Sequence, residues 1–158
     1  MVSDLEPQVD TTIENMAQFA VLKDSQPIRA ACFSPSGDYF VLGTNSKALK
    51  ICQLPNLEGG PNQPIRVVLE QLNHHIGSIY CVDWSRTERL IASGSNDRHI
   101  KLLVVPNLQQ GQNEILEMTL LGHQAIVRTV CFNPTNDMIL LSGGQVDRDL
   151  KVWNSETG

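Results

Sequence analysis

The sequence contains only four cysteines among 158 residues, and none is paired at the close spacing of a zinc site. Each lies in an apolar run. We therefore expect small, buried and reduced side chains, which is how cysteine behaves in a reducing compartment. These residues are Cys32, Cys52, Cys81 and Cys131.

The sequence also lacks segments that would direct the chain to or through a membrane. The N-terminal stretch MVSDLEPQVD is acidic and has no apolar core, so it is not a signal peptide. No apolar run approaches the length that spans a bilayer. We therefore expect a soluble, intracellular protein.

Positive charge is in short supply. Twelve Lys and Arg residues stand against seventeen Asp and Glu residues, which gives a formal net charge of −5. A general nucleic-acid binder normally carries a basic face, so this balance argues against that class. A local basic patch remains open.

What the sequence does contain is an internal repeat. Three segments align: PIRAACFSPSGDYFVLGTNSKALKIC, SIYCVDWSRTERLIASGSNDRHIKLL and IVRTVCFNPTNDMILLSGGQVDRDLKVW. Anchored on Phe33, Trp84 and Phe132, they are offset by 51 and then 48 residues. Three segments in register indicate a repeat architecture.

Each repeat divides into short runs rich in Val, Ile and Leu, separated by turns rich in Pro, Gly, Ser and Asn. Such runs favour strands over helices. Four antiparallel strands repeated at roughly 50 residues are typical of propeller blades. We therefore predict an all-β fold: a partial β-propeller arc of about three four-stranded antiparallel blades, the last lacking its fourth strand.

The repeats resemble the WD-repeat family. The third unit carries Gly122 and His123, then Ser142 and Asp147, and ends in Trp153 followed by Asn, where the family has Trp-Asp. The second and first units depart further from the pattern. The second has His74–His75, Ser93 and Asp97, with Leu103 for the tryptophan, and the first has Asp24, Ser46 and Cys52 at the histidine, aspartate and tryptophan positions.

The resemblance implies that histidine, serine, aspartate and tryptophan form a buried hydrogen-bonded network within a blade. A Ser/His/Asp trio can also suggest a catalytic triad. A triad, however, needs an exposed nucleophile, a pocket and oxyanion donors, and here the trio recurs in two blades. We therefore predict structural networks and no enzyme. Their members are His123, Ser142, Asp147 and Trp153 in the third unit, and His75, Ser93 and Asp97 in the second.

Metal or cofactor binding is not expected. His74 and His75 are adjacent, so on a strand they would point to opposite faces and could not chelate one metal together.

The resemblance also implies a partner-binding face made by the loops between blades and by the turns between second and third strands. By register, Arg29, Tyr80 and Arg128 lie at equivalent positions near the mouth of the channel. Arginine and tyrosine dominate binding hot spots, and this set would suit an acidic peptide or a tubulin-like surface. The loop and turn positions beside them are Pro27, Ser78 and Ile126, and Asn45, Asn96 and Val146.

Units one and two further resemble the nemitin-type, microtubule-associated WD-repeat proteins. This resemblance implies a protein–protein interaction scaffold, with tubulin or microtubule-associated proteins as partners and a cytoplasmic, cytoskeletal location. The alternative is a substrate-receptor or regulatory subunit of an enzyme complex such as a ubiquitin ligase. No nucleic-acid or membrane partner is expected.

The predicted organisation is a leader over residues 1–18, either flexible or a short helix, and a propeller fragment over residues 19–158. The repeats span about 26–73, 74–121 and 122–158. Residues 19–22 align with the fourth strand of a unit and are expected to form a strand. We expect the fragment to join the remaining blades of a larger propeller, or to self-associate through its open edges.

Overall fold

The computed structural model describes residues 18–108 and 115–157. All but the last residue of the predicted leader lies outside the described residues. Within the described part, no helix has the length and apolarity that crossing a membrane requires.

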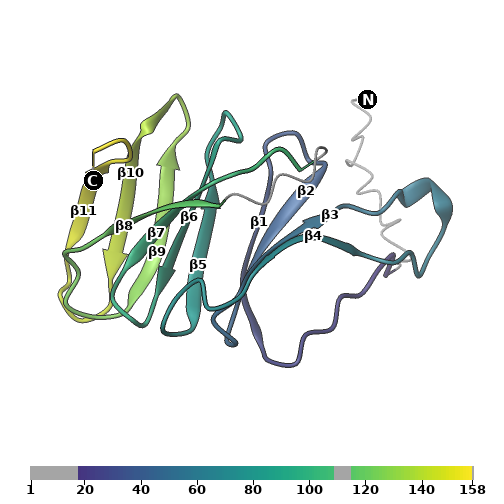
Figure 1. Ribbon diagram of the computed structural model, residues 1–158, viewed down its shortest axis with the longest axis horizontal. Helices are drawn as coiled ribbons and strands as arrows, with labels where there is room; N and C mark the ends of the chain where they lie inside the picture. Colours follow the sequence, from purple (N-terminus) through teal and green to yellow (C-terminus); the bar gives the residue numbers. More distant parts are fainter. Residues whose placement is uncertain (1–17, 109–114, 158) are drawn as a thin grey trace, which may run out of the picture.

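The described residues form three antiparallel sheets, with four, four and three strands, which confirms the predicted all-β blade architecture. The blades lie side by side along an arc, from the N-terminal blade to the yellow C-terminal one (Figure 1). The first contains β1 (Ile28–Phe33), β2 (Tyr39–Thr44), β3 (Leu49–Gln53) and β4 (Arg66–Gln71), with a 3-10 turn, η1 (Leu57–Gly59), between the last two. The second contains β5 (Ile79–Trp84), β6 (Leu90–Ser95), β7 (Ile100–Val104) and β8 (Leu116–Leu120), and the third β9 (Val127–Asn133), β10 (Asn136–Gly144) and β11 (Leu150–Asn154).

Each strand pairs with the next one along the chain, so every blade is a meander of hairpins. The register is equivalent in the three blades: Leu42 pairs with Lys50, Ser93 with Lys101, and Ser142 with Lys151. This equivalence places the motif residues of each repeat at the same height in its sheet.

Apolar side chains fill the two seams between blades. Each buried Leu or Ile contributes roughly 1.5–3 kcal/mol by leaving water. The first seam is lined by Val41, Leu49, Ile51, Ile79, Trp84, Ile91 and Leu103. The second is lined by Ala92, Ile100, Leu102, Leu120, Val127, Val130, Phe132 and Leu140.

Two glycines allow the inner strand of one blade to approach the second strand of the blade before it. A Cβ on Gly43 would lie 2.5 Å from Ile79 Cγ2, and one on Gly94 would lie 2.6 Å from Val127 Cγ1. Since real Cβ atoms do not approach so closely, the seams depend on glycine at both positions.

A carboxylate also ties the inner strands together. The backbone N–H of Phe132 donates to Asp83 Oδ2 at 2.6 Å, and Cys32 Sγ lies 3.6 Å from Asp83 Oδ1. Asp83 on β5 therefore contacts both neighbouring blades.

Two expectations about local structure are wrong. Residues 19–22 form no strand, although Phe19 O accepts a hydrogen bond from Gln63 N at 3.1 Å. The cysteines are all free thiols, but Cys131 is exposed because it lies on the face of β9 that points away from the second blade, and only Cys52 is buried.

Candidate functional site

The third blade contains a complete hydrogen-bonded chain of the four predicted side chains. His123 Nδ1 donates to Asp147 Oδ2 at 2.6 Å, which leaves Nε2 to accept the hydroxyl hydrogen of Ser142 at 2.7 Å. Trp153 Nε1 donates to the same Ser142 Oγ at 2.7 Å. The three contacts use the three available hydrogens, so a neutral imidazole makes all of them. The hydrogen bond from His123 lowers the pKa of Asp147.

The position of Ser142 is incompatible with nucleophilic chemistry. Ser142 is buried, with 1% of its surface exposed, and its hydroxyl oxygen is hydrogen-bonded to both His123 and Trp153. A catalytic serine must reach a bound substrate. The geometry is that of an internal brace between strands.

The second blade forms a related chain in which His74 takes the place of the missing tryptophan. His75 bonds to Asp97 at 2.9 Å and to Ser93 Oγ at 2.9 Å, as expected from register. Leu103, at the tryptophan position, has no N–H in its side chain. His74 Nε2 instead lies 2.8 Å from Ser93 Oγ, while its Nδ1 lies 2.6 Å from Glu117 Oε1 on β8.

The expectation that His74 and His75 point to opposite faces is wrong. Both lie in the bend between β4 and β5, where the alternation of a strand does not apply, and both rings converge on Ser93. Their ring centroids are 5.0 Å apart, edge to face. In the part of the chain that the structure describes, no group of three or more His, Cys, Asp or Glu side chains is arranged to hold a metal.

The second chain is one hydrogen short. Its two imidazoles make four contacts, at Asp97, twice at Ser93, and at Glu117, but two neutral imidazoles and one hydroxyl supply only three hydrogens. With both carboxylates ionised, two imidazole acceptors face the single hydroxyl hydrogen of Ser93. A proton on His74 would complete all four bonds.

Burial opposes that proton. It lowers the pKa of His74 to about 4 and also lowers the pKa of His75, although Glu117 and Asp97 pull in the other direction. Burial raises the pKa of Glu117, but His74 and the Lys101 ammonium 3.0 Å away lower it more. The second blade therefore contains a buried, proton-sensitive cluster.

The first blade replaces the network with an ion pair. Lys50 Nζ lies 2.7 Å from Asp24 Oδ2 and 3.0 Å from Glu70 Oε1, and the Asp24 side chain is only 4% exposed. Ser46, at the aspartate position, bonds to Thr44 Oγ1 at 2.7 Å. Cys52, at the tryptophan position, is fully buried.

The three residues predicted at the mouth of the channel meet in one cluster. The guanidinium carbon of Arg29 lies 5.0 Å from the ring centroid of Tyr80, and that of Arg128 lies 4.4 Å from it. Both arginines are exposed. They come from the first and third blades and flank the tyrosine of the second, at the edge where β1, β5 and β9 begin.

Polar side chains of the neighbouring turns hold the two arginines in place. Asn45 Oδ1 accepts from Arg29 Nε at 2.9 Å and from Ser78 Oγ at 2.8 Å. Gln145 Oε1 accepts from both Nε and Nη2 of Arg128.

The turn residue equivalent to Asn45 and Asn96 is Gln145, so the assignment of Val146 to that position is wrong. Asn45 N donates to Pro27 O, Asn96 N to Ser78 O, and Gln145 N to Ile126 O. The third turn has one extra residue, which the alignment of the aspartates concealed. Val146 is instead 70% exposed.

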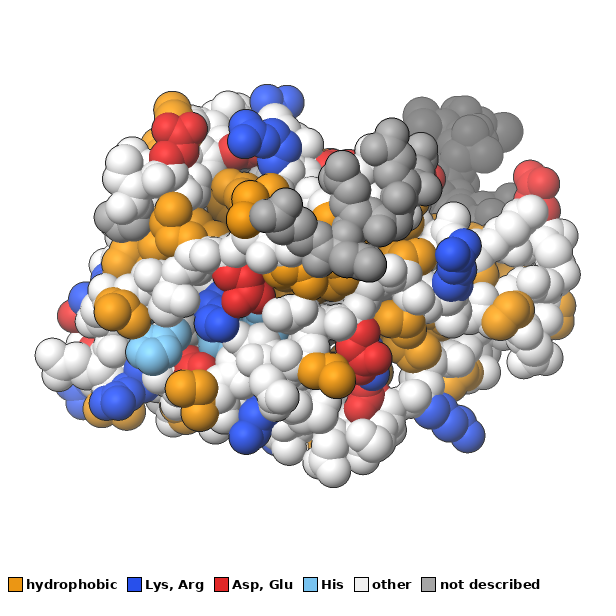
Figure 2. Space-filling model, in the orientation of Figure 1, with side chains coloured by type: hydrophobic (Ala, Val, Ile, Leu, Met, Phe, Trp, Pro, Cys, Tyr) orange, Lys and Arg blue, Asp and Glu red, His pale blue; other side chains and the backbone are white. Residues whose placement is uncertain are grey.

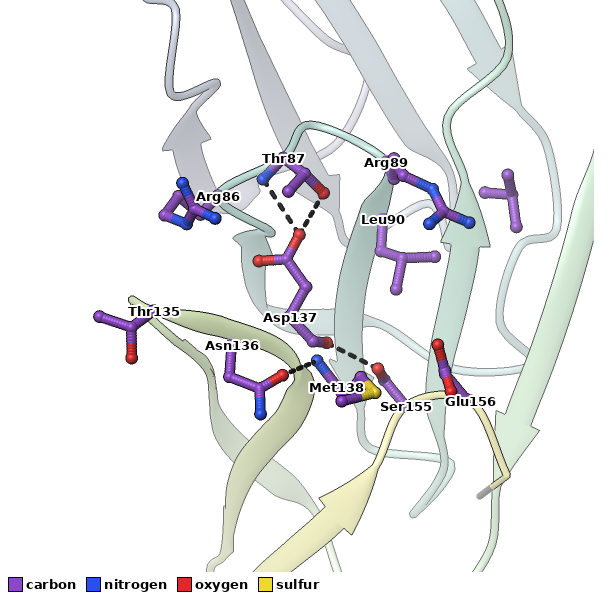
Figure 3. A pocket seen from close by; sticks show the side chains of 11 residues that line it. Arg86, Thr87, Arg89, Leu90, Thr135, Asn136, Asp137, Met138, Ser155 and Glu156 are labelled. Carbon is purple, nitrogen blue, oxygen red and sulfur yellow. Dashed lines mark hydrogen bonds between the residues drawn. The ribbon is translucent and has the colours of Figure 1, made fainter.

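A hollow of about 500 Å³ lies at the opposite edge, between the second and third blades. Its central carboxylate, Asp137, accepts hydrogen bonds from the backbone N–H of Thr87 at 3.0 Å and from the Thr87 hydroxyl (Figure 3). Ser155 Oγ donates to the carbonyl of Asp137 at 2.6 Å. These hydrogen bonds join the loops of two blades, so the hollow is part of the interface between the blades.

Comparison with known proteins agrees with the geometry. Residues 66–102 and 115–154 match the family model described as WD domain, G-beta repeat. These segments cover most of the second blade, the last strand of the first and nearly all of the third. The matched segments are therefore WD40 repeats.

The relatives are diverse. The chain is 31% identical over 84 residues to the probable cytosolic iron-sulfur protein assembly protein 1 of Candida glabrata, covering 53% of this chain and 24% of that protein. It is 36% identical over 95 residues to the COMPASS component SWD1 of Saccharomyces cerevisiae, covering 53% and 21%. It is 28% identical over 148 residues to the nuclear distribution protein PAC1 of Komagataella phaffii, covering 87% and 27%. The chain thus spans about a quarter of the length of these relatives.

Proposed function

We propose that this chain is a non-catalytic scaffold that binds another protein through the face around Arg29, Tyr80 and Arg128. The observation that carries the proposal is the double contact of two guanidinium groups from neighbouring blades with one tyrosine ring. Arginine and tyrosine are enriched among the residues that dominate interface energies.

The cluster is suited to recognition because its donors are positioned in advance. A guanidinium has five N–H donors, and the hydrogen bonds to Asn45 and Gln145 use one on Arg29 and two on Arg128. Asn45 and Gln145 restrict the side chains before a partner arrives, which reduces the entropy lost on binding. The remaining donors suit carboxylates of a partner.

The finer proposal is a microtubule-associated role, with tubulin or a microtubule-associated protein as partner and a cytoplasmic, cytoskeletal location. It is supported by the resemblance of the first two repeats to nemitin-type proteins and by the cationic character of the cluster.

A second candidate is a substrate-receptor or regulatory subunit of an enzyme complex, such as a ubiquitin ligase. The support is the similarity to SWD1, which is named as a component of a larger assembly, COMPASS.

We also propose that further blades, or a second copy of the chain, cover the outer face of the third blade. Leu150, Val152 and Leu141 are 69%, 65% and 37% exposed there. Their equivalents in the second blade, Ile100, Leu102 and Ala92, are buried in a seam.

Co-sedimentation with taxol-stabilised microtubules separates the two candidates. The microtubule role predicts that the wild-type chain pellets with the polymer and that Arg29→Glu with Arg128→Glu stays in the supernatant. A wild-type chain that remains soluble, or a variant that pellets equally well, would contradict this role. Arg86→Glu with Arg89→Glu, at the opposite edge, is the charge-matched control.

A further inference from the structure

We propose that the turns between the second and third strands form a cationic rim that binds an acidic protein segment carrying apolar side chains. This inference rests on the proposed function and identifies the chemistry of the partner. The rim consists of Lys47, Arg98 and Arg148, one from each blade.

The rim residues share an unusual backbone conformation. Lys47, Arg98 and Arg148 have φ values of 71°, 75° and 54°, in the left-handed region that glycine and asparagine adopt most readily. All three side chains are exposed. A basic residue thus occupies this position in every blade although the backbone would favour glycine.

The rim lies at the same edge as the arginine–tyrosine cluster. In each blade a backbone hydrogen bond of 2.9–3.1 Å joins the turn to the residue just before the inner strand: Asn45 to Pro27, Asn96 to Ser78 and Gln145 to Ile126. Figure 2 shows Lys and Arg side chains along this lower edge of the molecule. The rim and the cluster therefore form one surface.

This surface is cationic although the chain is not. The aspartates of the second and third turns are turned inward: the side chains of Asp97 and Asp147 are 8% and 7% exposed and bond to His75 and His123. Asp149 is exposed, but Lys151 lies 3.1 Å from it. The positive charges of the rim therefore face solvent, although the formal net charge of the whole chain is −5.

Exposed apolar side chains lie in or beside two of these turns. Ile76, in the loop before β5, is 78% exposed, and Val146, in the third turn, is 70% exposed. Exposed apolar groups among charges of one sign fit a ligand that offers both carboxylates and apolar side chains.

A protein segment fits this surface better than a nucleic acid. Proteins that bind single strands stack bases on aromatic rings, and the ring of Tyr80 is already engaged by two guanidinium groups. The net negative charge of the chain would also repel a polyanion at long range.

Fluorescence anisotropy with three labelled probes tests the proposal: a peptide of glutamates interrupted by leucines, a poly-glutamate peptide, and a single-stranded oligonucleotide. We expect the glutamate–leucine peptide to bind most tightly and to be weakened by added salt. The triple variant Lys47→Glu, Arg98→Glu, Arg148→Glu should weaken it by about tenfold, since each exposed ion pair contributes a modest amount.

The matched control is Arg66→Glu, Arg86→Glu, Arg89→Glu, which changes the net charge equally through exposed arginines at the opposite edge. Circular dichroism melting verifies that each variant is folded. Equal affinity of the rim variant and the control, or tighter binding of the oligonucleotide than of either peptide, would overturn the proposal. If the rim variant loses no protein partner while Arg29→Glu with Arg128→Glu does, the proposed function stands and the rim is not its site.

Discussion

Ser93 and Ser142 occupy the same place in their blades but receive their second hydrogen-bond partner from different residues. In the third blade it is the indole of Trp153, and in the second it is the imidazole of His74. The indole always donates, whereas an imidazole donates at Nε2 only when its proton is there. Replacing the indole with the imidazole of His74 therefore gives the second blade a network whose hydrogen bonding depends on protonation.

The core of each network could be predicted from sequence because its members recur at the same offsets in two repeats. Glu117 and Lys101 could not, because they belong to strands whose pattern indicated only apolar runs. The role of His74 was also missed, since a strand was assumed where the chain bends. The signal that could have revealed this role is that the polar residue His74 stands in the repeat whose tryptophan is replaced by Leu103.

His74 predicts a specific pH dependence of stability. Its folded pKa of about 4 lies below the ordinary value of about 6.5, so between these values the unfolded chain takes up a proton that the folded chain refuses. The free energy of unfolding should therefore fall as the pH falls from 6.5 to 4, by up to about 3 kcal/mol from this residue. In His74→Gln, which keeps an N–H donor but cannot titrate there, the fall should be shallower.

Urea unfolding of the wild type and His74→Gln across this pH range measures the difference. His75 remains in both proteins and accounts for the slope that persists. Identical slopes would contradict the prediction. A wild type that gains stability on acidification would show that completing the fourth hydrogen bond outweighs burial.

At the scale of elements, the blades could be predicted because short apolar runs and turn residues recur with the same spacing. The details that failed are those in which the chain leaves regular structure. The third turn contains one extra residue, so the backbone hydrogen bond expected at Val146 is made by Gln145. Residues 19–22 have the composition of a strand, but in the structure they form none.

The seams between blades depend on two strand glycines whose role is not visible in one repeat alone. Gly94→Ala would place a methyl group 2.6 Å from both Val127 Cγ1 and Cys81 Sγ. Overpacking of this kind should lower the free energy of unfolding by about 1–3 kcal/mol. The measurement is chemical denaturation followed by tryptophan fluorescence.

Gly59→Ala is the control, because the atoms nearest its Cβ would be the amide end of the Gln63 side chain and not a neighbouring blade. Its effect should remain within about 0.5 kcal/mol. Equal effects of the two substitutions would show that the seam tolerates the methyl group and that the close approach of the strands is not required.

At the scale of the whole molecule, the two edges of the arc have different characters. One edge is closed by loop contacts such as Ser36 with Glu88 and Thr87 with Asp137, which bind blade to blade. The other edge carries Arg29, Tyr80 and Arg128, on blades that buried polar networks stabilise. A rigid base beneath an exposed set of polar anchors is the arrangement expected of a binding scaffold.

The most direct test of this assignment is a quantitative comparison of partners. The wild-type chain, Arg29→Glu with Arg128→Glu, and the opposite-edge control Arg86→Glu with Arg89→Glu are isolated from the same cell extract and their bound proteins are measured by mass spectrometry. We predict that the first variant loses the specific partners of the wild type and that the control retains them. Retention of every partner by the first variant, or equal loss in both variants, would contradict the assignment of the binding face.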